Sequence, residues 1–237
     1  MDAKKDIGAK GAKEKKKVKK IFFILPLCLL AAVMLCVAAA VLYRYNVIPH
    51  GKYPGERFGI ERFVSSVDRD GDGIDDQTDI LESVKAYLAT EPKYESRYYA
   101  GGWPDDGYGV CTDVVARGLL GAGYDLQTLV DEDRAAHPED YAQDERPDKN
   151  IDFRRVRNLR VYFARNAVSL TTDTSKIEEW QAGDIVIWQG HVGVISDVRN
   201  YKGVPFVWHH ANPAQTSYEQ DILETFGEIV GHYRISE

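Results

Sequence analysis

The 237-residue chain contains few sulfur-bearing side chains, two methionines and three cysteines. Cys28 and Cys36 lie within one apolar run near the N-terminus, so Cys111 is the only thiol in the remainder of the chain. A lone cysteine has no disulfide partner in its own domain, which excludes a fold built on disulfide bridges. An unpaired cysteine in an exported domain indicates a reactive or intermolecular thiol. Cys111 is therefore the first candidate for chemistry.

Positive charge is scarce outside the first 20 residues. That segment carries nine lysines and three acidic residues, a net charge of +6, while the whole chain carries −7. Residues 21–237 therefore carry −13. An acidic surface repels polyanions, so we expect no nucleic-acid partner.

Long hydrophobic runs are absent except for one. Residues 21–43 are 23 uncharged residues, and a helix of this length covers roughly 34 Å, enough for the hydrocarbon core of a bilayer. The lysines before it place the N-terminus in the cytoplasm. We therefore expect a cytoplasmic tail (1–20), a single transmembrane helix (21–43), a stalk (44–66) and an extracytoplasmic domain at the cell membrane. A cleaved signal peptide is the alternative, because Ala38, Ala39 and Ala40 offer small residues for cutting.

The outer domain changes its periodicity along the chain. Apolar residues recur at helical spacing first, and short β-rich runs separated by turns follow. The expected helices are 79–90, 111–123, 126–136 and 153–166, and the expected strands are 184–188, 191–196, 204–210 and 228–235. Helices followed by an antiparallel sheet indicate an α+β fold over residues 80–237.

One cysteine and three histidines are placed where an activated nucleophile needs them. Cys111 stands at the expected start of a helix, where unpaired amides and the helix dipole lower a thiol pKa and favour the thiolate. His191 opens a strand, and His209 and His210 end the next one. Neighbouring strand residues point to opposite faces, so only one of the two joins the site. The arrangement favours nucleophilic catalysis.

Three stretches resemble the NlpC/P60 superfamily of papain-like cysteine peptidases, namely GVCTDVV, GDIVIWQGHVGVISD and FVWHHANP. Residues 98–235 resemble, more closely, a bacterial family known as domain of unknown function 1287. The shared stretches there include AGGWPDDGYGVCTDVV, PDKNIDFRRVRNLRVYF and IVGHYRI. The resemblance implies a papain-like NlpC/P60-type domain, with helices packed on an antiparallel sheet, after one transmembrane helix.

The resemblance also implies a role for each site residue. Cys111 would attack an amide carbonyl, and His191 would act as general base and then as general acid. The third position falls on His209, which would orient the imidazole, with His210 as the alternative third residue. The implied reaction needs no catalytic cofactor. The expected substrate is a cell-wall peptide of peptidoglycan, hydrolysed through a thioester at Cys111.

Two other functions fit parts of this pattern. A catalytically inactive module would use the same groove to bind cell-wall peptides. A zinc hydrolase would use the histidines with a carboxylate, but their spacing lacks the HExxH pattern of helical zinc sites. We therefore expect a cysteine hydrolase.

An aspartate-rich run precedes the first helix of the domain. Its spacing matches the twelve-residue calcium loop, where oxygen ligands alternate and a glycine at position six permits a sharp bend. The predicted ligands are Asp68, Asp70, Asp72, Ile74 through its carbonyl, Asp76 and Asp79. The alternative is a solvated acidic turn that caps the helix. We expect a structural calcium ion that clamps the stalk to the domain.

Overall fold

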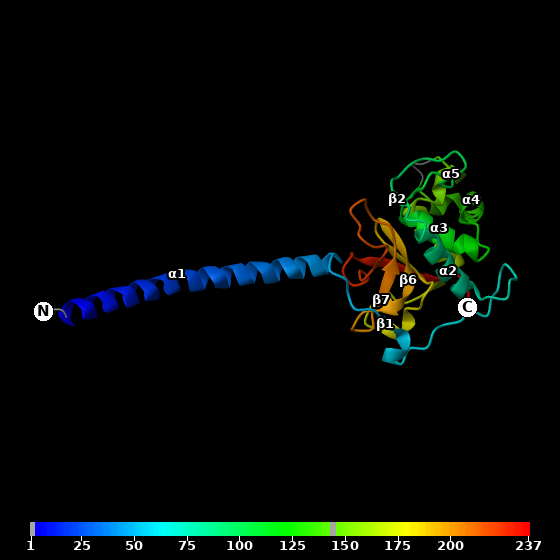
Figure 1. The fold of residues 1–237 in the computed structure, drawn as a ribbon. Coiled ribbons are helices and arrows are strands. Elements are labelled where there is room, and N and C mark those ends of the chain that lie inside the picture. Colours follow the sequence, from blue (N-terminus) through cyan, green and yellow to red (C-terminus); the bar gives the residue numbers. More distant parts are fainter. Residues whose placement is uncertain (1–2, 143–145) are drawn as a thin grey trace. The chain divides into compact units, whose positions relative to one another are not determined.

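A computed structural model describes residues 3–142 and 146–237. The chain divides into two compact units, Met1–Pro49 and His50–Glu237. Figure 1 shows one long helix in the first unit and a packed set of helices and strands in the second. The candidate catalytic residues all belong to the second unit.

The first unit is built around helix α1, Ala3–Arg44. Its segment Leu25–Arg44 has a mean hydropathy of 2.8, and its apolar side chains are exposed. A helix this long and apolar can cross a membrane, a property that membrane anchors and signal sequences share. The expected apolar helix is therefore present, and helical structure continues back into the lysine-rich segment.

The second unit contains an antiparallel sheet. Among the described residues its strand order is β4-β9-β5-β6-β7-β8, and β1 pairs with the last residues of β6. The strands are β1 Tyr53–Pro54, β4 Val168–Ser169, β5 Ile185–Trp188, β6 His191–Arg199, β7 Pro205–Trp208, β8 Glu219–Gln220 and β9 Ile229–Arg234. A separate parallel pair joins β2, Lys93–Tyr94, to β3, Tyr108–Gly109. The sheet places β6 beside β7, which brings the histidine-bearing segments together.

Strand β5 shows that both faces of the sheet are covered. Ile185 and Ile187 pack with the helices, whereas Val186 and Trp188 pack with Trp180 on the other face. The alternation follows from the two-residue period of a strand. All four residues of β5 are buried, which explains their uninterrupted apolar sequence.

Helices cover the first of these faces. They are α2 Asp76–Leu88, α3 Cys111–Gly121, α4 Leu126–Ala136, α5 Lys149–Asp152 and α6 Val156–Asn166, with short 3-10 helices η1 Gly55–Phe58, η2 Pro138–Asp140 and η3 Ile177–Glu179. Helix α2 packs closely on α3, because a Cβ at Gly118 would lie 2.6 Å from Cγ2 of Val84. Helix α3 packs in turn on β6. This layering carries the start of α3 to the sheet.

The expected α+β fold and antiparallel sheet are confirmed, whereas several boundaries differ. The helix expected over residues 153–166 begins three residues later, as α6, and the short helix α5 precedes it. The break between them contains Arg154, whose Nε donates to Asp113 of α3 at 2.7 Å. The segment 44–66, expected as a stalk, contributes β1 and η1 to the second unit. Short edge strands carry too few residues for an alternating pattern to reveal them.

Candidate active site

Helix α3 begins at Cys111, immediately after the loop that follows β3. Asp113 fixes this start, because its Oδ2 accepts from the Val110 N–H at 2.8 Å while its own N–H donates to the Val110 carbonyl at 3.0 Å. The buried guanidinium of Arg154 holds the same carboxylate. Asp113 therefore caps the first turn, and the cap and the ion pair together hold Cys111 at the helix N-terminus.

Cys111 is half-buried as a residue, and its thiol points inward among backbone amides. Burial raises the pKa of this thiol to about 11, although the N–H groups of Val192, Thr112 and Cys111 itself act in the opposite direction. The prediction of a low thiol pKa is therefore wrong. The helix start is as expected, but packing α3 against β6 desolvates the sulfur more strongly than the amides stabilise its charge.

His191 and His209 lie next to each other on the sheet. His191 opens β6, His209 follows β7, and Nε2 of His191 lies 3.0 Å from Nδ1 of His209. Nε2 of His209 lies 2.9 Å from Oε1 of Gln220 on β8. Burial, reinforced by the charges of His209 and His210, lowers the pKa of His191 to about 3, and burial lowers the pKa of His209 to about 4. Both imidazoles are therefore neutral at pH 7.

These three buried side chains, here called the histidine relay (Gln220, His209 and His191), determine where the protons reside. Nε2 of His209 lies 2.9 Å from the amide oxygen of Gln220, which only accepts, and 3.4 Å from the amide nitrogen of Gln215, which only donates. The shorter contact assigns the proton of His209 to Nε2 and leaves Nδ1 to accept. His191 must then donate from Nε2. Its Nδ1 is left without a proton and is the basic atom of the relay.

His210 occupies a different environment from His209. Its ring meets the rings of Tyr94 and Tyr218 edge-on, with centroids 5.2 and 5.1 Å away. Its Nδ1 is buried and has no hydrogen-bond partner among the described residues. Consecutive residues of an extended segment point to opposite sides, and it is His209 that bonds to His191.

Cys111 and His191 are brought to the same place by the packing of α3 on β6. The amide of Val192, the residue after His191, reaches the sulfur. Within the described part of the chain, no hydrogen bond joins the sulfur to the His191 ring. The site therefore pairs a neutral thiol with a neutral imidazole, and proton transfer can accompany nucleophilic attack.

Gln220 is a site residue that the sequence does not reveal. It lies in the run TSYEQD, which has no recognisable periodicity and no motif that indicates catalysis. Strand β8 pairs with β7 and sets Gln220 opposite Val207. His209 is two residues beyond Val207, so this strand pairing alone brings the Gln220 side chain to the His209 ring.

The aspartate run forms the expected loop before α2. Carboxylate oxygens of Asp68, Asp70 and Asp72 come within 4.8 Å of one another. The Ile74 N–H donates to Asp72 Oδ1 at 2.8 Å, which places Ile74 in the same exposed loop. Burial, and then the charges of Asp72, Asp70 and Asp68, raise the pKa of Asp79 to about 6.

Asp76 and Asp75 behave differently from an exposed ligand set. Asp76 is buried, and its carboxylate accepts from the Tyr124 hydroxyl at 2.5 Å and from the Arg69 N–H at 2.8 Å. Each of its oxygens thus already accepts one hydrogen bond, and its place among the calcium ligands stays a prediction. Asp75 is the N-cap of α2 and accepts from Thr78.

Potential metal ligands do not gather around the histidine relay. In the part of the chain that the structure describes, such groups comprise the loop aspartates and a second set of His137, Glu139 and Asp140. His232 instead bonds to the buried Asp184, at 3.0 Å, and stacks on Trp180.

The fold and this site define a mixed α+β domain with a cysteine at a helix start and a histidine relay on the adjoining sheet. Residues 81–235 match the family model described as Domain of unknown function (DUF1287), and the chain belongs to this family. It is 41% identical over 162 residues to the Uncharacterized protein YijF of Escherichia coli (strain K12), across 65% of this chain and 77% of that protein. No solved structure matches the chain. The expected membership of family 1287 is confirmed.

Proposed function

We propose that this protein is an extracytoplasmic cysteine hydrolase of the papain-like NlpC/P60 type, acting on amide bonds of cell-wall peptides. The observation that carries the proposal is the histidine relay, which leaves an unprotonated Nδ1 on His191, the residue whose neighbour Val192 directs its amide to the Cys111 sulfur. The chain order of cysteine, histidine and third polar residue supports the placement in that superfamily.

The first chemical step forms a thioester. As Cys111 Sγ bonds to the substrate carbonyl carbon, its proton passes to Nδ1 of His191, and the carbonyl oxygen becomes an oxyanion. The amides of Cys111 and Thr112 at the start of α3, which point to the sulfur in the resting protein, stabilise that charge. The C–N bond then breaks, and the leaving amine takes the proton from His191.

The second step releases the acyl group. His191 removes a proton from a water molecule, whose oxygen attacks the thioester carbon. The C–S bond breaks, a carboxylic acid leaves, and the proton returns to the Cys111 sulfur. His209 does not touch the substrate in this scheme, because its role is to hold His191 in the required tautomer.

The location of the substrate follows from the proposed topology. Segment Leu25–Arg44 would anchor the chain in the membrane with the lysine-rich end in the cytoplasm and the second unit outside. Peptidoglycan is the peptide-bearing polymer outside a bacterial membrane, and the acidic domain would move along it without adhering to its anionic groups. Protease accessibility of the second unit in intact cells tests this arrangement.

The decisive experiment incubates the full chain, in detergent, with purified peptidoglycan and follows new amino groups and peptide products by mass spectrometry. The wild type should release products, and Cys111→Ala should release none. Cys111→Ser should retain a small fraction, because a hydroxyl is a weaker nucleophile than a thiol. Turnover by Cys111→Ala equal to that of the wild type would overturn the proposal.

A second function, that of a cell-wall peptide-binding module without turnover, is favoured by the high pKa of the Cys111 thiol. The two functions predict different results when a peptide occupies the site. In a hydrolase, substrate peptides yield a thioester on Cys111, detected as a mass increase that hydroxylamine removes. In a module, the wild type and Cys111→Ala bind peptidoglycan equally, and neither gains mass.

A calcium ion is the proposed structural partner of the aspartate loop. The clustered carboxylates of Asp68, Asp70 and Asp72 support it, because a divalent cation would relieve the repulsion that raises the pKa of nearby Asp79. The ion would tie the loop to the start of α2 and take no part in catalysis.

A further inference from the structure

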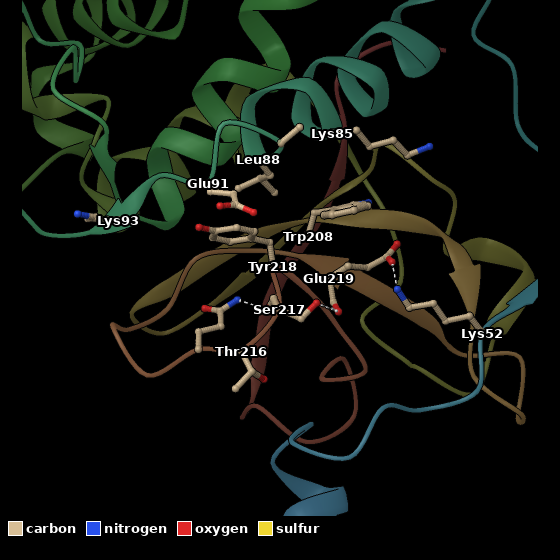
Figure 2. A pocket seen from close by; sticks show the side chains of 12 residues that line it. Lys52, Lys85, Leu88, Glu91, Lys93, Trp208, Thr216, Ser217, Tyr218 and Glu219 are labelled. Atoms are coloured by element: carbon tan, nitrogen blue, oxygen red, sulfur yellow. Dashed lines mark hydrogen bonds and ion pairs between the residues drawn. The ribbon is translucent and has the colours of Figure 1, made fainter.

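A groove of about 690 Å³ lies beside the histidine relay, between the end of α2 and the segment from Trp208 to Glu219. Figure 2 shows the side chains that line it. Its aromatic walls are Trp208, which precedes His209, and Tyr218, whose carbonyl accepts from the His209 N–H at 2.9 Å. This volume is in the range of small-molecule binding sites.

The charged residues of the groove are not equally neutralised. Lys52 pairs with Glu219, and Lys85 pairs with Asp197 at 2.8 Å. Glu91 has no ion pair and no side-chain hydrogen bond within the described residues. Figure 2 shows Lys93 extending away from the Glu91 carboxylate. Within the described residues, Glu91 therefore places an unpaired negative charge in the groove, and Lys93 places an unpaired positive charge that points away from it.

The position of this charge is unusual. Figure 2 shows the Glu91 carboxylate over the ring of Tyr218 with Trp208 beside them, and the Glu91 charge contributes to the raised pKa of Tyr218. The face of an aromatic ring is itself electron-rich, so a carboxylate above it is repelled. Glu91 also has a positive φ of 52°, which a side chain rarely adopts. A cation between the carboxylate and the rings would turn this repulsion into attraction.

We propose that this groove binds an organic cation, specifically an ammonium group carried on a small molecule or a peptide. The carboxylate of Glu91 supplies the opposite charge, and the faces of Tyr218 and Trp208 supply cation–π contacts. Leu88, a buried residue that lines the groove, provides an apolar surface for the carbon chain that carries the ammonium group. The site does not require chemistry at Cys111.

Isothermal titration of the full-length Cys111→Ala protein in detergent tests the proposal, with tetramethylammonium and L-lysinamide as probes at constant ionic strength. Both probes should bind saturably, and acetate should not bind. Glu91→Gln should weaken binding about tenfold, the effect of about 1.4 kcal/mol. Glu132→Gln is the matched control, because it removes one negative charge from an exposed position of α4 outside the groove and should change affinity less than twofold.

Ring variants separate the aromatic contribution from folding. Tyr218→Phe keeps the ring face and should bind as the wild type does, whereas Tyr218→Leu should lose several-fold in affinity. A lysine-containing peptide compared with its Nε-acetylated form distinguishes an ammonium borne by a peptide from a free amine. Absence of saturable binding, or equal affinities of wild type and Glu91→Gln, would overturn the proposal. Neither result depends on whether the protein hydrolyses peptidoglycan.

Discussion

Nε2 of His209 lies 2.9 Å from the side-chain oxygen of Gln220, and this contact determines which nitrogen of His191 carries a proton. Gln220 touches neither the thiol nor the place of a substrate carbonyl. It acts indirectly, because its hydrogen bond fixes the tautomer of His209, and the tautomer of His209 fixes that of His191. Gln220 is therefore a positioning residue, with an effect that can be measured independently of folding.

Replacing Gln220 by Leu should lower kcat about 10- to 100-fold, because the tautomers of both histidines are no longer fixed. Gln220→Glu should retain most activity, since a carboxylate also accepts from His209 Nε2. Nitrogen chemical shifts of the two rings should show a mixed tautomer population in Gln220→Leu only. Unchanged shifts in that variant would contradict the role given to Gln220.

The two neutral histidines should make stability depend on pH. Their folded-state pKa values, about 3 and about 4, lie below the ordinary value of 6.5, so below pH 6.5 the unfolded chain binds more protons than the folded one. Stability is therefore complete above about pH 6.5 and is lost as the pH falls, by up to about 1.4 kcal/mol per pH unit for each histidine. Urea unfolding between pH 7 and 4 measures this slope.

The matched variant for this experiment replaces both His191 and His209 by Gln. Its free energy of unfolding should change less steeply over the same pH range. Carboxylates elsewhere titrate equally in both proteins, so the difference between the two slopes isolates the histidines. Identical slopes would contradict the lowered pKa values, because they would show that the two rings bind protons equally in the folded and the unfolded chain.

Calcium should stabilise the second unit through the aspartate loop. At a concentration 100 times the dissociation constant, the ion would add about 2.7 kcal/mol to the free energy of unfolding. Asp70→Asn and Asp72→Asn should remove most of this gain, whereas Asp105→Asn, an exposed aspartate outside the loop, should keep it. Thermal unfolding with calcium and with a chelator gives the measurement, and equal melting temperatures in the two conditions would exclude the ion.

The buried pair of Asp113 and Arg154 should be a major contributor to the position of Cys111. Asp113→Asn preserves the size of the side chain but leaves the guanidinium uncompensated, which should cost about 3–5 kcal/mol of unfolding free energy. The double variant Asp113→Leu with Arg154→Met should be more stable than the single one, because no unpaired charge remains. Denaturant titration compares the two variants. An Asp113→Asn protein as stable as the wild type would contradict this account.

Sequence patterns predict the larger features of this fold well. The runs around Ile187 and Val194 carry enough consecutive apolar residues to reveal β5 and β6, and the helix start at Cys111 follows from its flanking pattern. Short edge strands such as β8 give no such signal. Gln220 was missed for this reason, since its function depends wholly on strand pairing.

Local sequence patterns also fail to predict properties that depend on tertiary packing. The choice between His209 and His210 depends on sheet register, which two adjacent identical residues cannot disclose. The pKa of Cys111 depends on how closely β6 covers the helix start, a property of neighbours 80 residues away in sequence. Asp76 fits the spacing of a calcium loop, but its carboxylate accepts a hydrogen bond from Tyr124. The spacing within the loop does not predict this contact.

The pairing of β9 with β5 has a consequence for how the chain folds. Arg234 on β9 supplies both hydrogen bonds that neutralise Asp184, at 2.8 Å each, and β9 fills the gap between β4 and β5. A chain made from its amino end can bond Asp184 to Gln77 and to the Gln181 amide, but the guanidinium that neutralises this acid is absent until β9 has been made. The sheet therefore closes between β4 and β5 only after the final strand of the chain is available.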